Sequence, residues 1–318
     1  MAKRALITGV TGQDGSYLAE LLVGKGYEVY GLVRRLSTPN LANLASVIDH
    51  IHLIDGDLGD QGSLAYAVKE AQPDEVYNLA AQSFVGTSFK QPVLTAEVSG
   101  VGVLRLLECV RLHAPHAKFY QASTSELYGK VREEPQSETT PFHPRSPYGV
   151  AKMMGYWAVV NYRESYGMHA SNGILFNHES PRRGIEFVTR KITSTVAKIA
   201  QGKAKELVLG NLDARRDWGY APEYVEGMWR MLQQKDSDDY VLATGTSTTV
   251  REFVQWSFEA AGIPDWQKHV RTDLKYERPA EVHTLLGAPV KAATNLGWKA
   301  KTMPRELCKI MVNADLSG

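Results

Sequence analysis

The chain opens on a short apolar stretch that runs into a loop with glycine at every third position. Arg4 to Thr8 predicts a strand, and Gly9, Gly12 and Gly15 precede a helical pattern over Ser16 to Lys25. Glycine permits a tight turn at positive φ, and a backbone without side chains lets a pyrophosphate reach the free N–H groups at a helix start. The spacing is not the G-x-G-x-x-G of the commonest dehydrogenases, yet its place after a first strand predicts a dinucleotide-binding loop.

Strand and helix patterns alternate through the first half of the chain. Such alternation is typical of a parallel sheet with right-handed crossovers, so we expect an α/β fold with a doubly wound parallel sheet of the Rossmann type. The expected strands are Arg4 to Thr8, Glu28 to Val33, Ile51 to Ile54, Glu75 to Leu79, Lys118 to Ala122 and His169 to Phe176, and the expected helices are Ser16 to Lys25, Gln61 to Ala71, Val93 to Leu112 and Tyr148 to Tyr166.

Beyond about Phe176 the alternation weakens. The pattern there predicts helices over Phe187 to Gln201, Pro222 to Gln234, Val250 to Ala261 and Pro304 to Asp315, with a short apolar run at Glu206 to Leu209 and a charged loop at Asn211 to Trp218. This mixture indicates a smaller α/β domain over the open end of the sheet. We therefore expect residues 1–176 to form the dinucleotide-binding domain, to which later segments can return, and residues 177–318 to form mainly a substrate domain.

Charge and cysteine content exclude several classes of partner. The chain has 36 Lys and Arg against 35 Asp and Glu residues, a formal net charge of +1, whereas a general nucleic-acid binder needs a basic face. Cys109 and Cys308 lie far apart and in no metal-ligand spacing, so we expect neither a disulfide scaffold nor a metal site. No signal-peptide pattern and no apolar run of about 18 residues occurs, which favours a cytoplasmic protein without membrane contact.

Arg34 and Arg35 stand at the end of the second expected strand, where NAD-binding proteins carry an acidic residue for the ribose 2′-hydroxyl. Two guanidinium groups suit a 2′-phosphate instead, which favours NADP; the alternative is a solvated pair of surface arginines. Asp57 follows the third strand and either meets the adenine edge or only forms a turn in its own loop. The small residues from Leu79 to Ser83 follow the fourth strand, at the edge where open α/β sheets bind ligands.

A tyrosine and a lysine four residues apart stand at the start of the last helix of the first domain. Tyr148 and Lys152 would share one helix face, and Ser146 and Pro147 before them are a helix-start signal. We expect the ammonium group to lower the pKa of the phenol and to hold a cofactor ribose. Tyr148 could then exchange a proton with a substrate hydroxyl while a hydride moves to nicotinamide. One such pair among fifteen tyrosines could also arise by chance.

The segment after the fifth strand adds hydroxyl groups and one carboxylate. Ser123, Thr124 and Ser125 could hydrogen-bond a substrate oxygen, although such residues also form ordinary turns. Glu126 has no task in a simple dehydrogenase. Beside a substrate it could abstract an acidic proton α to a new ketone and then protonate a departing hydroxyl; otherwise it is a solvated loop carboxylate.

Longer segments of the chain resemble the extended short-chain dehydrogenase/reductase superfamily and, within it, the sugar-nucleotide dehydratases. Over nearly the whole chain the resemblance is to the GDP-mannose 4,6-dehydratase family. The segments that carry it are Thr11 to Gly15, Asn78 to Ser83, Ala122 to Gly129, Pro144 to Gly149, Asn161 to Gly167, Ile174 to Gly184 and Gly210 to Gly219.

The resemblance implies a reaction and a tightly held NADP. Tyr148 would take the proton of the sugar C4 hydroxyl as the C4 hydride leaves, and Glu126 would remove the C5 proton. Glu126, helped by Thr124, would protonate the leaving C6 hydroxyl, and the hydride would return to C6. The product would be GDP-4-dehydro-6-deoxy-D-mannose and water, for GDP-deoxysugar biosynthesis of the fucose or rhamnose type.

The resemblance also implies a set of site residues. The catalytic set is Thr124, Glu126, Tyr148 and Lys152. Cofactor contacts fall on Gly9, Thr11, Gly12, Gln13, Asp14, Gly15, Arg34, Arg35, Asp57, Leu58, Leu79, Ala80, Ala81, Gln82, Ser83, Tyr148, Lys152, His178 and Arg183. Nucleotide-sugar contacts fall on Ser83, Thr124, Ser125, Glu126, Tyr148, Asn177, Val188, Lys191, Gly210, Asn211, Arg216, Arg278 and Glu281. Three of these, Lys191, Arg216 and Arg278, would supply the local positive charge that a pyrophosphate needs.

The resemblance implies a homodimer or a homotetramer. The segment Leu36 to Leu41 lacks the further arginine and the length expected of the family's arginine loop, through which subunits share cofactor contacts in a tetramer, so a dimer is favoured over a tetramer. A reductase or epimerase of the same superfamily would have less need of Glu126. A catalytically silent NADP-binding regulator would have lost the catalytic residues. Dehydration of another GDP-sugar, such as a GDP-heptose, stays open.

Overall fold

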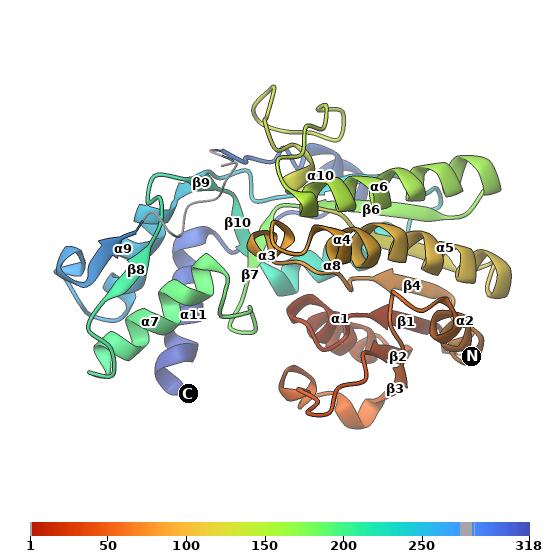
Figure 1. Cartoon of the computed structure of the whole chain (residues 1–318), viewed down its shortest axis with the longest axis horizontal. Helices are drawn as coiled ribbons and strands as arrows, with labels where there is room; N and C mark the ends of the chain where they lie inside the picture. Colours follow the sequence, from red (N-terminus) through yellow and green to blue (C-terminus); the bar gives the residue numbers. More distant parts are fainter. Residues whose placement is uncertain (1, 274–281, 283) are drawn as a thin grey trace.

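A computed structural model of the chain describes residues 2–273, 282 and 284–318. Its centre is a seven-stranded sheet in which every neighbouring pair of strands is parallel (Figure 1). The sheet order is β11-β6-β5-β4-β1-β2-β3, which confirms the doubly wound Rossmann-type sheet. The strands are β1 (Arg4–Thr8), β2 (Glu28–Val33), β3 (Ile51–Asp55), β4 (Glu75–Asn78), β5 (Lys118–Ala122), β6 (Ala170–Leu175) and β11 (Tyr240–Leu242).

Helices cover both faces of this sheet. On one face, α1 (Gln13–Gly24) packs beside α8 (Ala221–Leu232); on the other lie α2 (Gln61–Ala71), α5 (Gly102–His113) and α6 (Pro147–Tyr166). Strand β1 shows why both faces are covered, because Ala5 and Ile7 join the core under α1 and α8 while Leu6 joins the core under α2 and α5. Side chains of successive strand residues point to opposite faces, so an apolar run buries both.

The helix expected over Val93 to Leu112 is interrupted. It consists of α4 (Pro92–Ala96), a π-helical turn η3 (Glu97–Val101) and α5. A Cβ at Gly102 would lie 2.9 Å from the Cβ of Leu58, so this part of the helix approaches the loop after β3 very closely. Ser99 in the π turn accepts a hydrogen bond from the backbone N–H of Gln82 at 3.0 Å, which ties the helix to the loop after β4.

The remaining short elements connect the strands. They are η1 (Ala42–Leu44) and η2 (Ile48–His50) between β2 and β3, α3 (Val85–Ser88) after β4, and η4 (Ser125–Leu127) after β5.

A second lobe stands at the carboxyl edge of the sheet (Figure 1). Helices α7 (Val188–Ala200), α9 (Val250–Ala260) and α11 (Pro304–Ser317) enclose its core, which includes Trp218 and Phe253. The charged segment expected as a loop over Asn211 to Trp218 contains a strand and the start of another. The small sheets pair β7 (Asn177–Glu179) with β10 (Trp218–Tyr220), β8 (Leu207–Leu209) with β13 (Val270–Thr272), and β9 (Arg215–Arg216) with β12 (Thr248–Thr249).

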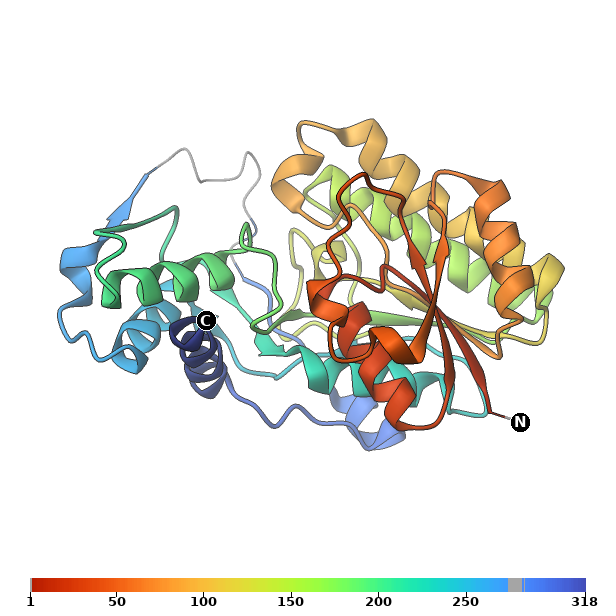
Figure 2. The same ribbon diagram turned by 90° about the horizontal axis from the view of Figure 1, so that it is seen from below.

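The chain returns to the sheet after entering the second lobe. Helix α8 lies against α1, and β11 extends the sheet beside β6 (Figure 2). Helix α10 (Val290–Leu296) packs on α8 and β11, whereas η5 (Trp266–His269) belongs to the second lobe. The two lobes are therefore not continuous in sequence.

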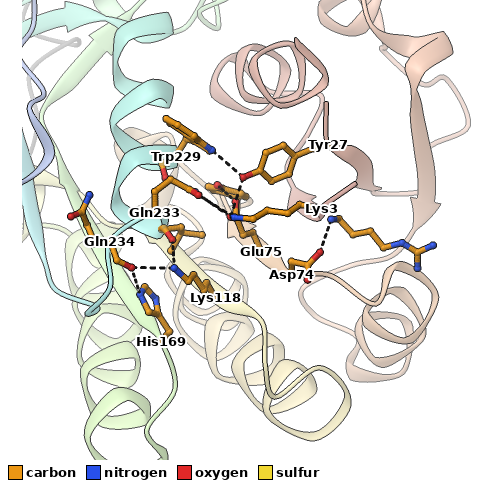
Figure 3. Close-up of polar contacts among 12 residues, drawn as sticks. Lys3, Tyr27, Asp74, Glu75, Lys118, His169, Trp229, Gln233 and Gln234 are labelled. Atoms are coloured by element: carbon orange, nitrogen blue, oxygen red, sulfur yellow. Dashed lines mark hydrogen bonds and ion pairs between the residues drawn. The ribbon is translucent and has the colours of Figure 1, made fainter. Parts of the chain in front are cut away.

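The amino edge of the sheet, opposite the second lobe, is closed by buried polar contacts (Figure 3). Glu75, only 1% exposed, accepts hydrogen bonds from Tyr77 at 2.7 Å, Lys3 at 3.0 Å and Tyr27 at 3.1 Å. Gln233, just after α8, also donates to Glu75 at 3.1 Å. These contacts dock the C-terminal end of α8 on the sheet.

Candidate active site

A cleft of about 790 Å³ lies between the lobes at the carboxyl ends of the strands. Its walls come from the loops after β4 and β5, the starts of α6 and α7, and strands β7 and β9. Many of the residues predicted from sequence line it: Asp14, Leu79, Ala81, Ser83, Thr124, Ser125, Glu126, Tyr148, Lys152, Asn177, His178, Arg183, Val188, Lys191, Gly210, Asn211 and Arg216. Two others, Arg278 and Glu281, lie outside the described residues.

The glycine loop has the geometry of an anion-binding turn. Gly9 has φ of +68°, and a Cβ at Gly15 would lie 2.3 Å from the Gly9 carbonyl oxygen. Gly12 is the N-cap of α1, and no side chain caps the helix there. The helix starts at Gln13 rather than Ser16, so Gln13, Asp14 and Gly15 form its first turn. The N–H groups of that turn are thus not used by a capping side chain, which fits a bound diphosphate.

A chain of buried polar groups holds the turn after β4 in place. Thr8 accepts hydrogen bonds from the backbone N–H groups of Leu79 and Ala80, both at 3.1 Å, and donates to Asn78 at 2.6 Å. Asn78 in turn donates to Gln121 at 2.8 Å. These contacts join β1, β4 and β5 where their carboxyl ends meet, and they bring Ala80 against Gly9.

The residues after β2 and β3 lie beside the cleft. Arg34 lines a neighbouring cavity of about 280 Å³ together with Ala81, Gln82 and Ser83, while Arg35 is exposed and donates to the Leu36 carbonyl at 2.9 Å. Asp57 accepts a hydrogen bond from the Gly59 backbone N–H at 2.7 Å. Its carboxylate therefore forms a turn in its own loop, which is one of the two interpretations that the sequence allows. Leu58 is buried against Gly102.

Helix α6 begins as the sequence predicts and presents Tyr148 and Lys152 to the cleft. The Ser146 hydroxyl caps the helix by accepting from the Gly149 N–H at 3.0 Å, and Pro147 occupies the first turn. Lys152 is 4% exposed; its Nζ donates to the Ala122 carbonyl at 2.8 Å and lies 5.9 Å from the centre of the Tyr148 ring.

The expected lowering of the Tyr148 pKa is wrong for this structure. Burial raises the pKa of Tyr148 to about 12, and the Glu126 charge adds to the rise, against a hydrogen bond from Thr124 that lowers it. Burial also lowers the pKa of Lys152 to about 8, although the Asp14 carboxylate opposes this. For both groups desolvation is the largest influence on the pKa, and it follows from burial in the folded protein, which the spacing of Tyr148 and Lys152 in the sequence does not reveal.

Thr124 and Glu126 lie directly after β5 and are both buried, each 8% exposed. Thr124 Oγ1 accepts a hydrogen bond from the Glu126 backbone N–H at 3.2 Å and so caps η4. Glu126, in this short helix, lines the cleft. The alternative reading of Glu126 as a solvated loop carboxylate is therefore wrong. A hydroxyl, a carboxylate and the Tyr148 phenol meet at one place, as proton transfer to and from a sugar requires.

Strand β7 supplies a second group of polar residues. His178 contacts Asp14 through its Nε2 at 2.8 Å, and Glu179 forms an ion pair with Arg183 at 3.1 Å. Glu179 also accepts from Thr189 at 2.5 Å. Asn177, the first residue of this strand, pairs with Trp218 in β10 and lines the cleft.

Several cleft residues were not predicted. Phe84 and Phe187 meet edge to face, with ring centres 5.7 Å apart, and the Arg183 guanidinium lies 3.7 Å from the centre of the Phe187 ring. Lys90 and Glu186 also line the cleft. These side chains lie in irregular segments where neither spacing nor residue type carried a signal, so sequence reasoning could not select them.

In residues 2–273, 282 and 284–318, no group of three or more His, Cys, Asp or Glu side chains could hold a metal ion. No helix in the described part of the chain is long and apolar enough to cross a membrane.

Solved structures with this fold include sugar-nucleotide enzymes. A UDP-glucose 4-epimerase of Thermus thermophilus, solved with NAD, matches with a TM-score of 0.87 and 29% identity over 98% of both chains. A UDP-glucose 4-epimerase of Thermotoga maritima, solved with UDP-glucose, matches with a TM-score of 0.87 and 26% identity over 98% of this chain and 97% of that one. The fold and the Tyr148 and Lys152 pair define an extended short-chain dehydrogenase/reductase.

The family follows from closer relatives. The family model for GDP-mannose 4,6 dehydratase matches residues 6–311. The GDP-mannose 4,6-dehydratase of Vibrio cholerae is 52% identical over 99% of this chain and 94% of its own length, and the human GDP-mannose 4,6 dehydratase is 52% identical over 98% and 91%. The chain belongs to the GDP-mannose 4,6-dehydratase family.

Proposed function

We propose that this protein converts GDP-D-mannose to GDP-4-dehydro-6-deoxy-D-mannose and water, with no net oxidation. The observation that carries the proposal is the meeting of Thr124, Glu126 and Tyr148 in one buried cleft, with Lys152 beneath them. A dehydrogenase or epimerase needs the tyrosine and lysine, whereas elimination of water needs a further group that can take up and return a proton. Membership of the dehydratase family supports the same conclusion.

The proposed cofactor is NADP. When bound, it would accept a hydride from C4 of the sugar and return it to C6. The uncapped first turn of α1 and the close approach of Gly15 to Gly9 fit its diphosphate. Arg34 fits its 2′-phosphate, because it lines a second cavity that shares Ala81 and Ser83 with the cleft.

The side chains of the cleft divide the proton transfers. Tyr148 takes the proton of the C4 hydroxyl as a phenolate. The positive charges of Lys152 and of NADP+, when it is bound, would favour that phenolate against the burial that raises the Tyr148 pKa. Glu126 takes the C5 proton once C4 is a ketone. Glu126 then returns a proton to the leaving C6 hydroxyl, assisted by Thr124, whose hydroxyl hydrogen-bonds the Tyr148 phenol. As the hydride returns to C6, C5 takes up one proton, which balances the proton that Tyr148 received from the C4 hydroxyl, so that water is the only other product. Lys191 and Arg216, which line the other end of the cleft, offer positive charge to the GDP diphosphate.

The direct test is to incubate the purified protein with a panel of nucleotide sugars and to measure the masses of the products by mass spectrometry. We expect GDP-mannose to lose one water without steady formation or consumption of NADPH. If water were lost only from another GDP-sugar, such as a GDP-heptose, the proposed substrate would be wrong but the proposed dehydration would stand. Continuous net NADPH turnover would contradict the proposal.

The variant Glu126→Gln tests the assignment of roles. It should lower the rate of water loss by about 100-fold or more, the usual contribution of a general acid or base, because the amide cannot take the C5 proton. Reduction of NADP+ at C4 does not need Glu126, so NADPH absorbance should still develop when GDP-mannose is added. Glu164→Gln, an exposed carboxylate at the opposite end of α6, is the matched control. Full dehydratase activity in Glu126→Gln would overturn the role.

We further propose that the protein acts as a homodimer. Val150, Met154 and Trp157 follow one face of α6 at helical spacing and are 52%, 41% and 55% exposed. Val93 and Leu94 of α4, which packs beside α6, extend this apolar face. Monomeric proteins seldom expose so much continuous apolar surface, and a second copy of the same helix would cover it. The cytoplasmic location expected from sequence stays a prediction.

A further inference from the structure

The imidazole ring of His178 is held between two hydrogen-bond acceptors. Its Nδ1 lies 2.7 Å from the Phe176 carbonyl oxygen, and its Nε2 lies 2.8 Å from a carboxylate oxygen of Asp14. The ring also stacks on Tyr224, with centroids 4.7 Å apart and planes 16° apart. A carbonyl oxygen cannot donate and an ionised carboxylate only accepts, so both ring nitrogens must carry hydrogen. This geometry selects the imidazolium form.

Asp14 lies where an uncompensated negative charge would harm the proposed function. It belongs to the first turn of α1, the turn whose N–H groups fit a diphosphate. Its carboxylate does not cap the helix; one oxygen accepts from Gln13 Nε2 at 2.9 Å and the other contacts His178. Gln13 is itself fixed, since it donates to the His178 carbonyl at 3.0 Å and accepts from Ser180 at 2.8 Å.

We propose that His178 serves as a fixed positive charge that neutralises Asp14 and holds it away from the N-terminus of α1, so that this helix end can bind an anion. The proposal rests on the proposed function only in that the anion is the diphosphate of NADP. His178 is then a positioning residue that acts through Asp14. The pair also joins the glycine loop to β7, and so connects the proposed cofactor site with the strand that carries Asn177 of the proposed substrate site.

The charges around the ring agree with this assignment. Burial lowers the pKa of His178, but the Asp14 carboxylate outweighs burial and the pKa is raised, although Arg183 opposes the rise. Burial raises the pKa of Asp14, but the charge and hydrogen bond of His178, the Gln13 hydrogen bond and the Arg183 charge together outweigh burial, so the pKa of Asp14 is lowered. The titratable groups that face His178 are Asp14, Arg183 and Tyr224.

The role differs in a measurable way from a direct contact between His178 and the cofactor. If His178 only touched the cofactor, its removal would weaken binding whatever stood at position 14. If it neutralises Asp14, its removal leaves a carboxylate beside the diphosphate, and removing that carboxylate as well restores binding. A double-mutant cycle therefore separates the two explanations.

The first experiment measures NADP+ binding by titration calorimetry to the full chain freed of cofactor. We expect His178→Gln to weaken binding by about 10- to 100-fold, within the usual range of coupling between contacting charged residues. The double variant His178→Gln with Asp14→Asn should recover most of the loss, and Asp14→Asn alone completes the cycle, from which the coupling between the two positions is calculated. His169→Gln, a histidine at the amino edge that contacts the Gln234 carbonyl, is the matched control.

A double variant that binds no better than His178→Gln would overturn the inference. Failure of the wild-type protein to bind NADP+ would instead overturn the proposed function.

The second experiment needs no cofactor. Nitrogen NMR of histidine-labelled protein at pH 7.5 should show one ring with both nitrogens protonated, and this signal should be missing in His178→Gln. In Asp14→Asn the same ring should become neutral, because its charged partner is gone. A neutral His178 in the wild-type protein would contradict the inference even if every variant folds poorly.

Discussion

Lys152 is a charged group kept inside the protein at a cost to stability. Its ammonium is 4% exposed and has one carbonyl partner, Ala122, at 2.8 Å. Its pKa falls from 10.5 to about 8 on folding, which corresponds to about 3 kcal/mol of unfavourable free energy for the charged form. Asp14 supplies part of the compensation. A buried lysine whose charge is only partly compensated by the protein is what a site that binds an anionic cofactor needs before the cofactor arrives.

The variant Lys152→Met should therefore be more stable and inactive. At pH 7 both the folded and the unfolded wild type carry the lysine charge, and the folded state bears the desolvation cost. We expect Lys152→Met to raise the free energy of unfolding by about 1–3 kcal/mol at pH 7, part of the cost being offset by the lost hydrogen bond to Ala122. Urea denaturation measures this. Lys198→Met, on the exposed side of α7, should change stability by no more than about 0.5 kcal/mol.

The gain should depend on pH with a definite sign. As pH rises from about 8 towards 10.5, folded Lys152 is neutral while unfolded Lys152 still binds a proton, so wild-type stability increases over this window. The difference between Lys152→Met and wild type should shrink over the same window. A difference that is constant with pH would show that the lysine charge is not the cause.

At the scale of elements, α8 links the two edges of the sheet. Near its start Tyr224 stacks on His178 at the cleft, and at its other end Lys118 donates to the carbonyls of Leu232 and Gln234 at 2.6 and 3.1 Å. Lysine at a helix C-terminus satisfies free carbonyls and complements the helix dipole. Glu75 docks the same end (Figure 3). Helix α8 is thus anchored at its C-terminal end, away from the cleft, and its N-terminal end contacts the cleft residue His178 through Tyr224.

Glu75→Ala should destabilise the fold and leave catalysis nearly unchanged. The substitution leaves the buried Tyr77 hydroxyl and the donors of Tyr27 and Gln233 without their acceptor, which should cost about 2–4 kcal/mol in urea denaturation. Because Glu75 lies at the amino edge, kcat measured well below the melting temperature should stay close to wild type. Asp265→Ala removes a carboxylate from an exposed ion pair with Lys268 and should cost at most about 1 kcal/mol. An equal loss in the free energy of unfolding for Glu75→Ala and Asp265→Ala would contradict this prediction.

At the scale of the whole molecule, the exposed face of α6 is the surface through which we propose that two copies associate. The cleft opens at the start of this helix, while Met154 and Trp157 point away from the sheet and remain exposed. Self-association through this face would leave the cleft of each copy open. It would also brace the helix that carries Tyr148 and Lys152.

The variant Met154→Lys with Trp157→Lys should be monomeric. Two lysines on each facing helix would repel across a two-fold interface and remove the apolar area that drives association. Sedimentation equilibrium should show the mass falling by half relative to wild type. Tyr66→Lys, an exposed aromatic residue on α2 that lies outside this face, should keep the wild-type mass. A wild-type monomer, or a dimer that persists in the double variant, would rule out this interface.

Much of the fold was determined by the sequence itself, because it rests on rules that act between neighbours in the chain. The bounds of β1, β2, β5 and α2 agree with the periodicity, since apolar alternation and caps such as Ser146 are local signals. The start of α1 was placed three residues late, because Gly15 and the polar Gln13 look unlike a helix, yet the turn needs glycine there. The glycine spacing and the pair Tyr148 and Lys152 could also be predicted, because each is a spacing within one short segment of the chain.

Only the tertiary structure decided how the groups of the cleft behave. Burial of Glu126, the high pKa of Tyr148 and the low pKa of Lys152 depend on neighbours from β5, α6 and α1 together. The contact of Asp14 with His178 joins residues 164 positions apart, and α8 (Ala221–Leu232) returns to pack on α1 (Gln13–Gly24). Desolvation and long-range charge depend on which segments meet in space, and no local pattern in the chain encodes that meeting.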